Sequence, residues 1–165
     1  VKNHLLLIKT FAKTQEHFSD WTLTIVGDGP LKNEYEKLSN DLNISKKVFF
    51  PGITKNIYTY YSKASIFVLS SVSEGLNLSL LEASSFGLPC IISNCSESHA
   101  QIIEHDKNGF IYKKDSQNEL YNYLCQLMKN GDQREEFGNY AVKNSKKFSN
   151  KNTIEKWSNF LKNEC

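Results

Sequence analysis

Short apolar runs with the character of β-strands alternate along this chain with longer segments of helical periodicity. The strand-like runs are rich in Val, Ile and Phe, whereas the helical segments repeat apolar residues every three or four positions. The pattern predicts strands at 21–26, 48–50, 66–69, 90–93 and 110–112, and helices at 4–18, 31–42, 56–64, 78–86, 98–104, 116–128, 132–147 and 152–161. Asn3 is expected to cap the first of these helices. This alternation is typical of a doubly wound parallel α/β sheet with helices on both faces, whose ligands bind at the carboxyl ends of the strands.

Composition narrows the class of protein further. The 165 residues are enough for one domain with a substantial core, and a hydrophobic fraction of 39% argues against disorder. A net charge of +2 with no strongly basic stretch argues against nucleic acid as a partner. The four cysteines form no CxxC pair, which indicates a reduced cytosolic protein without a structural metal.

The stretch that follows the predicted strand 66–69 combines a polar loop with the start of a helix that Gly87 and Pro89 terminate. If Asn77 caps this helix, the amides of residues 78–80 are unpaired donors at the positive end of the helix dipole. An anion such as a phosphate is expected there.

Two carboxylates flank this predicted anion site. Glu82 lies about 7.5 Å along the helix axis from the cap, while Glu74 precedes the turn. Carboxylates accept hydrogen bonds from hydroxyls, so the arrangement suits a phosphate between two hydroxylated rings, as in a nucleotide sugar. The alternative is that both glutamates are simply solvated surface residues.

The sequence resembles the carboxyl-terminal, donor-binding domain of the retaining GT-B glycosyltransferases of group 1, also called family four. The matching segments are LLLIKTFA, LTIVGDGP, VFFPG, YYSKASIFVLSSVSEGLNLSLLEASSFGLPCIIS and NGFIY. The resemblance implies the Rossmann-like second half of a GT-B fold followed by carboxyl-terminal helices, with residues 1–165 as a single nucleotide-sugar-binding domain.

The same resemblance implies roles for individual residues. Glu74 matches a family glutamate that contacts the donor sugar and has been considered as a nucleophile. Glu82 matches a glutamate that holds the ribose hydroxyls of the nucleotide. Lys2 matches a lysine that neutralises the diphosphate. The remaining donor-site residues are the backbone of Gly75, Leu76, Asn77 and Leu78 for the sugar and diphosphate, Gly27 and Gly29 lining the cleft, Ile53 and Lys55 near the base, and Ser71 as an outer contact. Without the resemblance, Gly27 and Gly29 would indicate only a tight turn. Lys55 would then be a solvated surface lysine, and Tyr61 and His99 would be packing residues.

The chain departs from the family pattern at two places. Gln101 replaces a common glutamate, and Cys95 to Ser98 replace the usual Gly-Gly loop. The resemblance also implies an amino-terminal acceptor domain and a strand with a phosphate-binding arginine ahead of Lys2, so we expect this chain to be a fragment. Without that strand, 21–26 and 66–69 face each other across a gap with unpaired backbone groups, which predicts low stability or non-native strand pairing.

The implied reaction is transfer of a sugar from a nucleoside-diphosphate sugar to an acceptor hydroxyl, with retention of configuration at the anomeric carbon. The resemblance thus implies a hexosyltransferase that acts in the synthesis of polysaccharide, lipopolysaccharide or glycolipid. The resemblance implies no cofactor and no metal, a saccharide or lipid-linked acceptor, and a cytoplasmic protein at the inner face of a bacterial membrane. The isolated fragment is expected to be inactive. Two alternatives stay open: a GT-B-like sugar-nucleotide epimerase, and a non-catalytic nucleotide-binding module.

Overall fold

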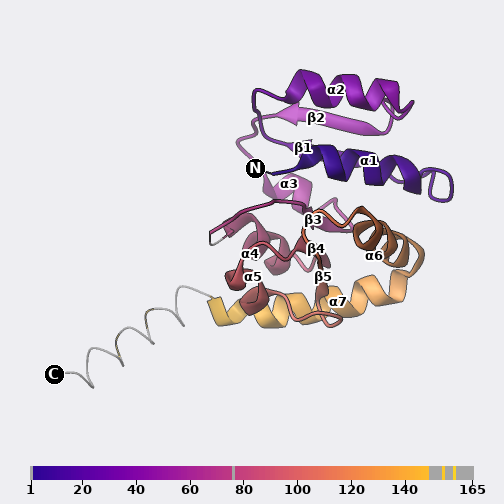
Figure 1. The fold of residues 1–165 in the computed structure, drawn as a ribbon. Coiled ribbons are helices and arrows are strands. Elements are labelled where there is room, and N and C mark those ends of the chain that lie inside the picture. Colours follow the sequence, from indigo (N-terminus) through magenta and orange to yellow (C-terminus); the bar gives the residue numbers. More distant parts are fainter. Residues whose placement is uncertain (1, 76, 149–153, 155–157, 159–165) are drawn as a thin grey trace.

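The computed structural model describes residues 2–75, 77–148, 154 and 158 (Figure 1). The strands are β1 (Leu23–Val26), β2 (Val48–Gly52), β3 (Phe67–Leu69), β4 (Cys90–Ser93) and β5 (Gly109–Tyr112). The helices are α1 (His4–Thr14), α2 (Lys32–Asp41), α3 (Tyr58–Tyr61), α4 (Leu78–Ser85), α5 (Glu97–Ile102), α6 (Gln117–Lys129) and α7 (Gly131–Ser145), followed by the 3-10 turn η1 (Lys146–Phe148). The alternation of strands and helices predicted from the sequence is therefore confirmed.

The strands form two parallel sheets, β1–β2 and β3–β4–β5. All four residues of β4 are buried, because this strand has a neighbour on each side and helices over both faces. β1 and β3 belong to different sheets, so the predicted gap between them is present. The predicted non-native pairing does not occur among the described strands, and low stability stays a prediction.

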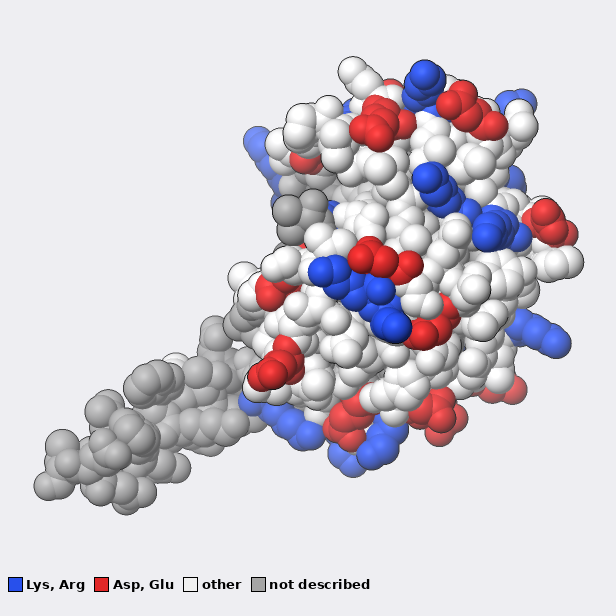
Figure 2. Space-filling model, in the orientation of Figure 1, with Lys and Arg blue, Asp and Glu red and all other residues white. Residues whose placement is uncertain are grey.

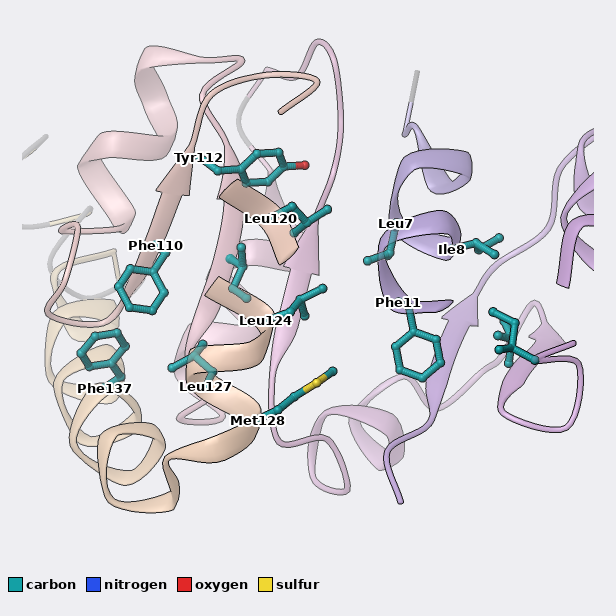
Figure 3. Close-up of a cluster of buried hydrophobic side chains, with 13 residues drawn as sticks. Leu7, Ile8, Phe11, Phe110, Tyr112, Leu120, Leu124, Leu127, Met128 and Phe137 are labelled. Carbon is teal, nitrogen blue, oxygen red and sulfur yellow. The ribbon is translucent and has the colours of Figure 1, made fainter. Parts of the chain in front are cut away.

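Helix α1 packs between the two sheets and helps them share one core. Its apolar face, formed by Leu7, Ile8 and Phe11, is at most 5% exposed and belongs to a single cluster of buried side chains. Figure 3 shows this face directed towards β1 on one side and towards the Leu120 face of α6 on the other. The periodicity of α1 thus gives an apolar face that shares one core with β1 and α6.

A second buried cluster fixes the position of α4. Leu80 and Ala83 are fully buried against β4 and α5, so the opposite face of α4 is turned outward. Behind this helix, α7 approaches so closely that a Cβ placed on Gly138 would lie 2.3 Å from the carbonyl oxygen of Gly87. The position of α4 therefore depends on the absence of a side chain at Gly138, in a helix that is distant in sequence.

Three local predictions differ from the structure. The first helix ends at Thr14 rather than residue 18, and α3 is a single turn. The expectation that Asn3 caps the first helix is wrong: Asn3 has φ 51° and its side-chain amide donates to Asp115 at 2.9 Å. The predicted helix at 152–161 lies almost wholly outside the described residues.

The surface has no large field of one charge on the face shown in Figure 2, where acidic and basic side chains are interspersed. In the described part of the chain, no helix is both long and apolar enough to span a bilayer.

Candidate functional site

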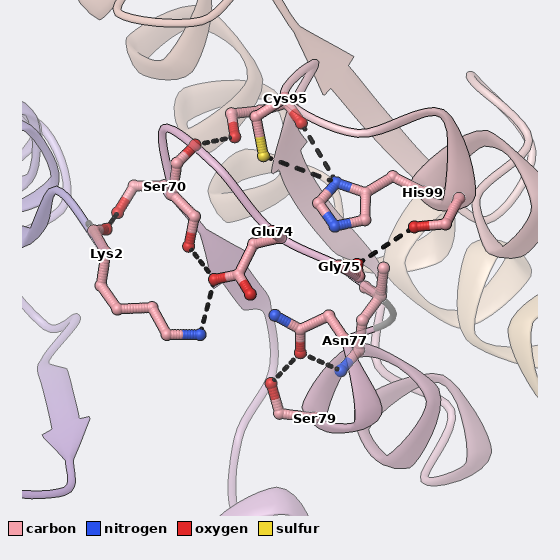
Figure 4. Close-up of polar contacts among 12 residues, drawn as sticks. Lys2, Ser70, Glu74, Gly75, Asn77, Ser79, Cys95 and His99 are labelled. Atoms are coloured by element: carbon pink, nitrogen blue, oxygen red, sulfur yellow. Dashed lines mark hydrogen bonds and ion pairs between the residues drawn. The ribbon is translucent and has the colours of Figure 1, made fainter.

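Lys2 and Glu74 meet at the carboxyl end of β3. The ammonium Nζ of Lys2 lies 2.6 Å from Oε1 of Glu74, and the hydroxyl of Ser71 donates to the same oxygen at 2.6 Å (Figure 4). The carbonyl of Lys2 accepts a further bond from Ser70 at 2.8 Å. The turn ahead of α1 is thus tied to the loop after β3 by backbone and side chain together.

The surroundings of Glu74 favour its ionised form. Its side chain is 14% exposed. This burial opposes ionisation, but the hydrogen bonds from Lys2 and Ser71 and the positive charge of Lys2 outweigh it, so the pKa of Glu74 is lowered. Because the folded-state pKa is depressed, the pair stabilises the fold above the ordinary carboxyl pKa, and this stability is lost as the pH falls through the lowered value.

Replacing Lys2 with methionine is expected to raise the pKa of Glu74, because burial is then opposed only by the Ser71 hydrogen bond and by the smaller effect of the His99 charge. A carbon-13 NMR titration of the Glu74 carboxyl in the intact protein measures the change. Lys13→Met, which alters an exposed lysine of α1, is the matched control. A Glu74 pKa that stays the same in Lys2→Met would contradict the described ion pair.

The amino terminus of α4 is capped as the sequence predicts. Asn77 has extended backbone, is 5% exposed, and its side-chain oxygen accepts from the amide of Leu80 at 3.2 Å. The prediction of three unpaired amides needs a correction, because Leu80 is thereby satisfied. Among the described residues, no hydrogen bond reaches the amides of Leu78 and Ser79, and these two remain as donors for an anion.

The loop after β4 supports the Glu74 loop from behind. Ser93 donates to the carbonyl of Ser71, and Ser98 donates to the carbonyl of Gly75 at 3.1 Å. His99 is 1% exposed beside them, with Nδ1 3.4 Å from the Ser93 carbonyl. No described residue bonds its Nε2. Ser98, in the segment that departs from the family pattern, therefore holds backbone next to Glu74, a role that spacing alone did not reveal.

Glu82 lies on the second turn of α4 with its carboxylate bonded to Tyr61. The tyrosine hydroxyl is 3.1 Å from Oε2, and Tyr61 is 6% exposed. The sequence identified Tyr61 only as a packing residue, because the bond joins residues 21 positions apart on different helices. A buried tyrosine needs a partner for its hydroxyl, and that requirement is the one signal that could have indicated the contact.

The other predicted donor-site residues lie in the loops after β1 and β2. Gly27 has φ 123°, which favours glycine, and its amide donates to Gly52 at 2.9 Å. Gly29 and Lys55 are exposed, and Ile53 is 83% exposed. No described hydrogen bond or ion pair joins these loops to Glu74. Leu76 is outside the described residues, and Leu78 is 66% exposed.

The candidate site lies apart from two hollows on the surface of the described chain. The two hollows, of about 450 and 350 Å³, contain none of the site's residues. The larger hollow is lined by Asp106, Lys107, Glu136, Asn139, Tyr140 and Lys143. The smaller one is lined by Glu36, Ser39, Asn40, Ser45, Val48, Phe49 and Phe50. Chemically, the surroundings of Glu74 offer the ammonium of Lys2, the amides of Leu78 and Ser79, and a carboxylate that accepts hydrogen bonds, and Glu82 adds a second carboxylate on α4. This set of groups suits a ligand with both phosphates and hydroxyls.

Comparison with known proteins agrees with this chemistry. A family model described as "Glycosyl transferases group 1" matches residues 1–144. An uncharacterised glycosyltransferase of Haemophilus influenzae is 32% identical over 94% of this chain and 44% of its own length. A Campylobacter jejuni protein named as an N-acetylgalactosaminyltransferase acting on a diphospho-undecaprenol saccharide is 29% identical over 89% of this chain and 40% of its own length. The chain therefore spans less than half the length of these two curated relatives.

The fold also matches solved structures. S. aureus TarM, crystallised as a mutant with fondaparinux, alpha-GlcNAc-glycerol and UDP, superposes with a TM-score of 0.89 and 28% sequence identity. The superposition covers 96% of this chain and 32% of the TarM chain. The predicted Rossmann-like α/β architecture, with helices on both faces of parallel sheets, is confirmed by this likeness and by the described topology.

Proposed function

Because the chain belongs to the glycosyl transferases of group 1, we propose that it binds a nucleoside-diphosphate sugar and supports transfer of the sugar to an acceptor hydroxyl with retention at the anomeric carbon. One observation carries the proposal: the Glu74 carboxylate is held by Lys2 and Ser71 close to the amino terminus of α4. The arrangement supports the proposal because a carboxylate can accept hydrogen bonds from sugar hydroxyls and the nearby helix amides can donate to phosphate oxygens.

The work of such a site is to stabilise the departing diphosphate. When the bond between the anomeric carbon and the phosphate oxygen breaks, the electron pair stays on the diphosphate. Lys2 and the amides of Leu78 and Ser79 are the groups that receive this charge. Lys2 is 51% exposed, so its ammonium can reach a phosphate while Glu74 turns to a sugar hydroxyl.

The second half of the proposed reaction forms the glycosidic bond. The acceptor oxygen bonds to the anomeric carbon on the face that the diphosphate leaves, and the acceptor proton passes to the departing phosphate oxygen. Glu74 orients the donor sugar during this exchange. The scheme has no resident metal, because Lys2 and the helix amides supply the positive charge.

The acceptor and the location are also proposals. We assign acceptor binding to an amino-terminal domain outside residues 1–165. A saccharide or lipid-linked acceptor at the cytoplasmic face of a membrane is supported by the Campylobacter jejuni relative, whose name includes an undecaprenol-linked saccharide. On this proposal the donor sugar is a hexose.

Calorimetric titration of the intact protein with UDP, GDP and ADP is expected to show selective binding of one nucleotide. Glu82→Ala is expected to weaken that binding at least tenfold, because the ribose hydroxyls lose their acceptor. Glu97→Ala, at an exposed position of α5, is the matched control and should bind as the wild type does. Absence of binding to all three nucleotides would contradict the proposed donor site.

A further inference from the structure

The Glu82 carboxylate is held from behind by a phenol on another helix. The hydroxyl of Tyr61 lies 3.1 Å from Oε2 of Glu82 and 3.4 Å from the carbonyl oxygen of Ser79. An ionised carboxylate only accepts hydrogen bonds, so the phenol donates. The shorter contact is the charge-assisted one, and it directs the single proton of Tyr61 to Glu82.

The position of this hydroxyl is fixed by packing. Tyr61 is the last residue of α3 and is 6% exposed. Its ring meets Phe67 edge-on, with centroids 6.2 Å apart, and Phe86 at a tilt, with centroids 5.6 Å apart. Because aromatic neighbours contact the ring from two elements, the phenol cannot follow the carboxylate if Glu82 moves. The carboxylate is thereby held at one place.

The donor stays protonated under ordinary conditions. Burial, followed by the hydrogen bond to Glu82 and its negative charge, raises the pKa of Tyr61 well above its usual value. The phenol therefore donates to Glu82 throughout the pH range in which nucleotide binding is measured.

In the described part of the chain, side-chain contacts occupy one edge of the Glu82 carboxylate. Among the described residues, no hydrogen bond or ion pair reaches Oε1 of Glu82. A carboxylate has about four acceptor positions, so the free edge can accept from two neighbouring hydroxyls. A glutamate held in place before binding also loses less side-chain freedom when a ligand arrives.

Resting on the nucleotide-sugar site proposed above, we infer that Tyr61 is a positioning residue that fixes the Glu82 carboxylate for the two hydroxyls of the nucleoside ribose. Tyr61 does not touch the nucleotide. The Tyr61 hydroxyl nevertheless sets how much more tightly the site binds a ribonucleotide than a nucleotide whose sugar lacks these hydroxyls.

The test uses the intact protein and a pair of ligands that differ only at the ribose. Whichever of UDP, GDP and ADP binds best is titrated beside its 2′,3′-dideoxy counterpart, into the wild type and into Tyr61→Phe. The variant is expected to bind the ribonucleotide about tenfold more weakly, because an unheld carboxylate is a poorer partner. It is expected to bind the dideoxynucleotide as the wild type does, because that ligand offers Glu82 no hydroxyls.

Two controls separate positioning from general damage. Tyr58→Phe removes a hydroxyl from the same short helix, at a residue that is 55% exposed, and should leave both affinities unchanged. In a Glu82→Gln background, Tyr61→Phe should have a smaller effect on the ribonucleotide, because the charged partner is already gone.

The outcomes are distinct. Equal weakening of both ligands by Tyr61→Phe would show a purely structural role and overturn the inference, and so would unchanged affinity for the ribonucleotide. Binding of the ribonucleotide by the wild type in either case leaves the proposed function standing. If the wild type binds none of the three nucleotides, the proposed function fails and the inference fails with it.

Discussion

Replacing Glu74 with alanine is expected to lower turnover of the donor about a thousand-fold in the intact enzyme, a loss of the size seen when a group acting in the transition state is removed. Two effects combine in this variant. The donor sugar loses the carboxylate that orients its hydroxyls, and the ammonium of Lys2 loses the partner that now lies 2.6 Å away. Because Asn77 and not Glu74 caps α4, the helix itself should remain formed.

The measurement is release of free nucleotide from the sugar donor, with and without acceptor. Glu97→Ala changes another glutamate at an exposed position of α5 and should retain near-normal turnover. Near-normal turnover in Glu74→Ala would exclude the assigned role. Release of nucleotide with conversion of the sugar in the absence of any acceptor would instead indicate an epimerase.

The largest effect on stability is expected at Gly138. Its Cβ, if present, would lie 2.3 Å from the backbone oxygen of Gly87, an atom that cannot rotate away as a side chain can. Gly138→Ala must therefore push α7 from α4, and overpacking of this kind costs about 3 kcal/mol of the free energy of unfolding. For a chain of this length the melting temperature should fall by about 6–12 °C.

Gly131 is the matched control, because it begins the same helix. A Cβ there would meet only the guanidinium of Arg134 at 3.6 Å, which is ordinary contact with the end of a flexible side chain. Gly131→Ala should stabilise the fold by up to about 1 kcal/mol, since alanine restricts the unfolded chain. Thermal denaturation of both variants distinguishes the two sites. Equal melting temperatures would show that α4 and α7 do not pack as closely as described.

Local features of the chain were predictable from the sequence because they depend on neighbours in sequence. Apolar periodicity placed α2 and β4 within about a residue of their bounds. The Asn77 cap was also predicted, since an Asx side chain needs only the amides of the next turn. The same reasoning failed at Asn3, whose backbone has φ 51° and whose side-chain amide donates to Asp115 in a distant segment, so its side-chain oxygen makes no capping bond to α1.

The sequence by itself thus determined the order of strands and helices, the start of α4 and the presence of Glu74 and Glu82 around it. Only the tertiary structure decided which groups hold those glutamates: Lys2 reaches Glu74 across 72 positions, and Tyr61 reaches Glu82 across 21. It also decided that the backbone of Gly87, just after α4, packs against Gly138 of α7, where a side chain would clash. The physical reason is one of range. Helical and strand periodicity arise from backbone geometry over a few residues, whereas a hydrogen bond of about 3 Å between distant segments depends on how whole elements pack.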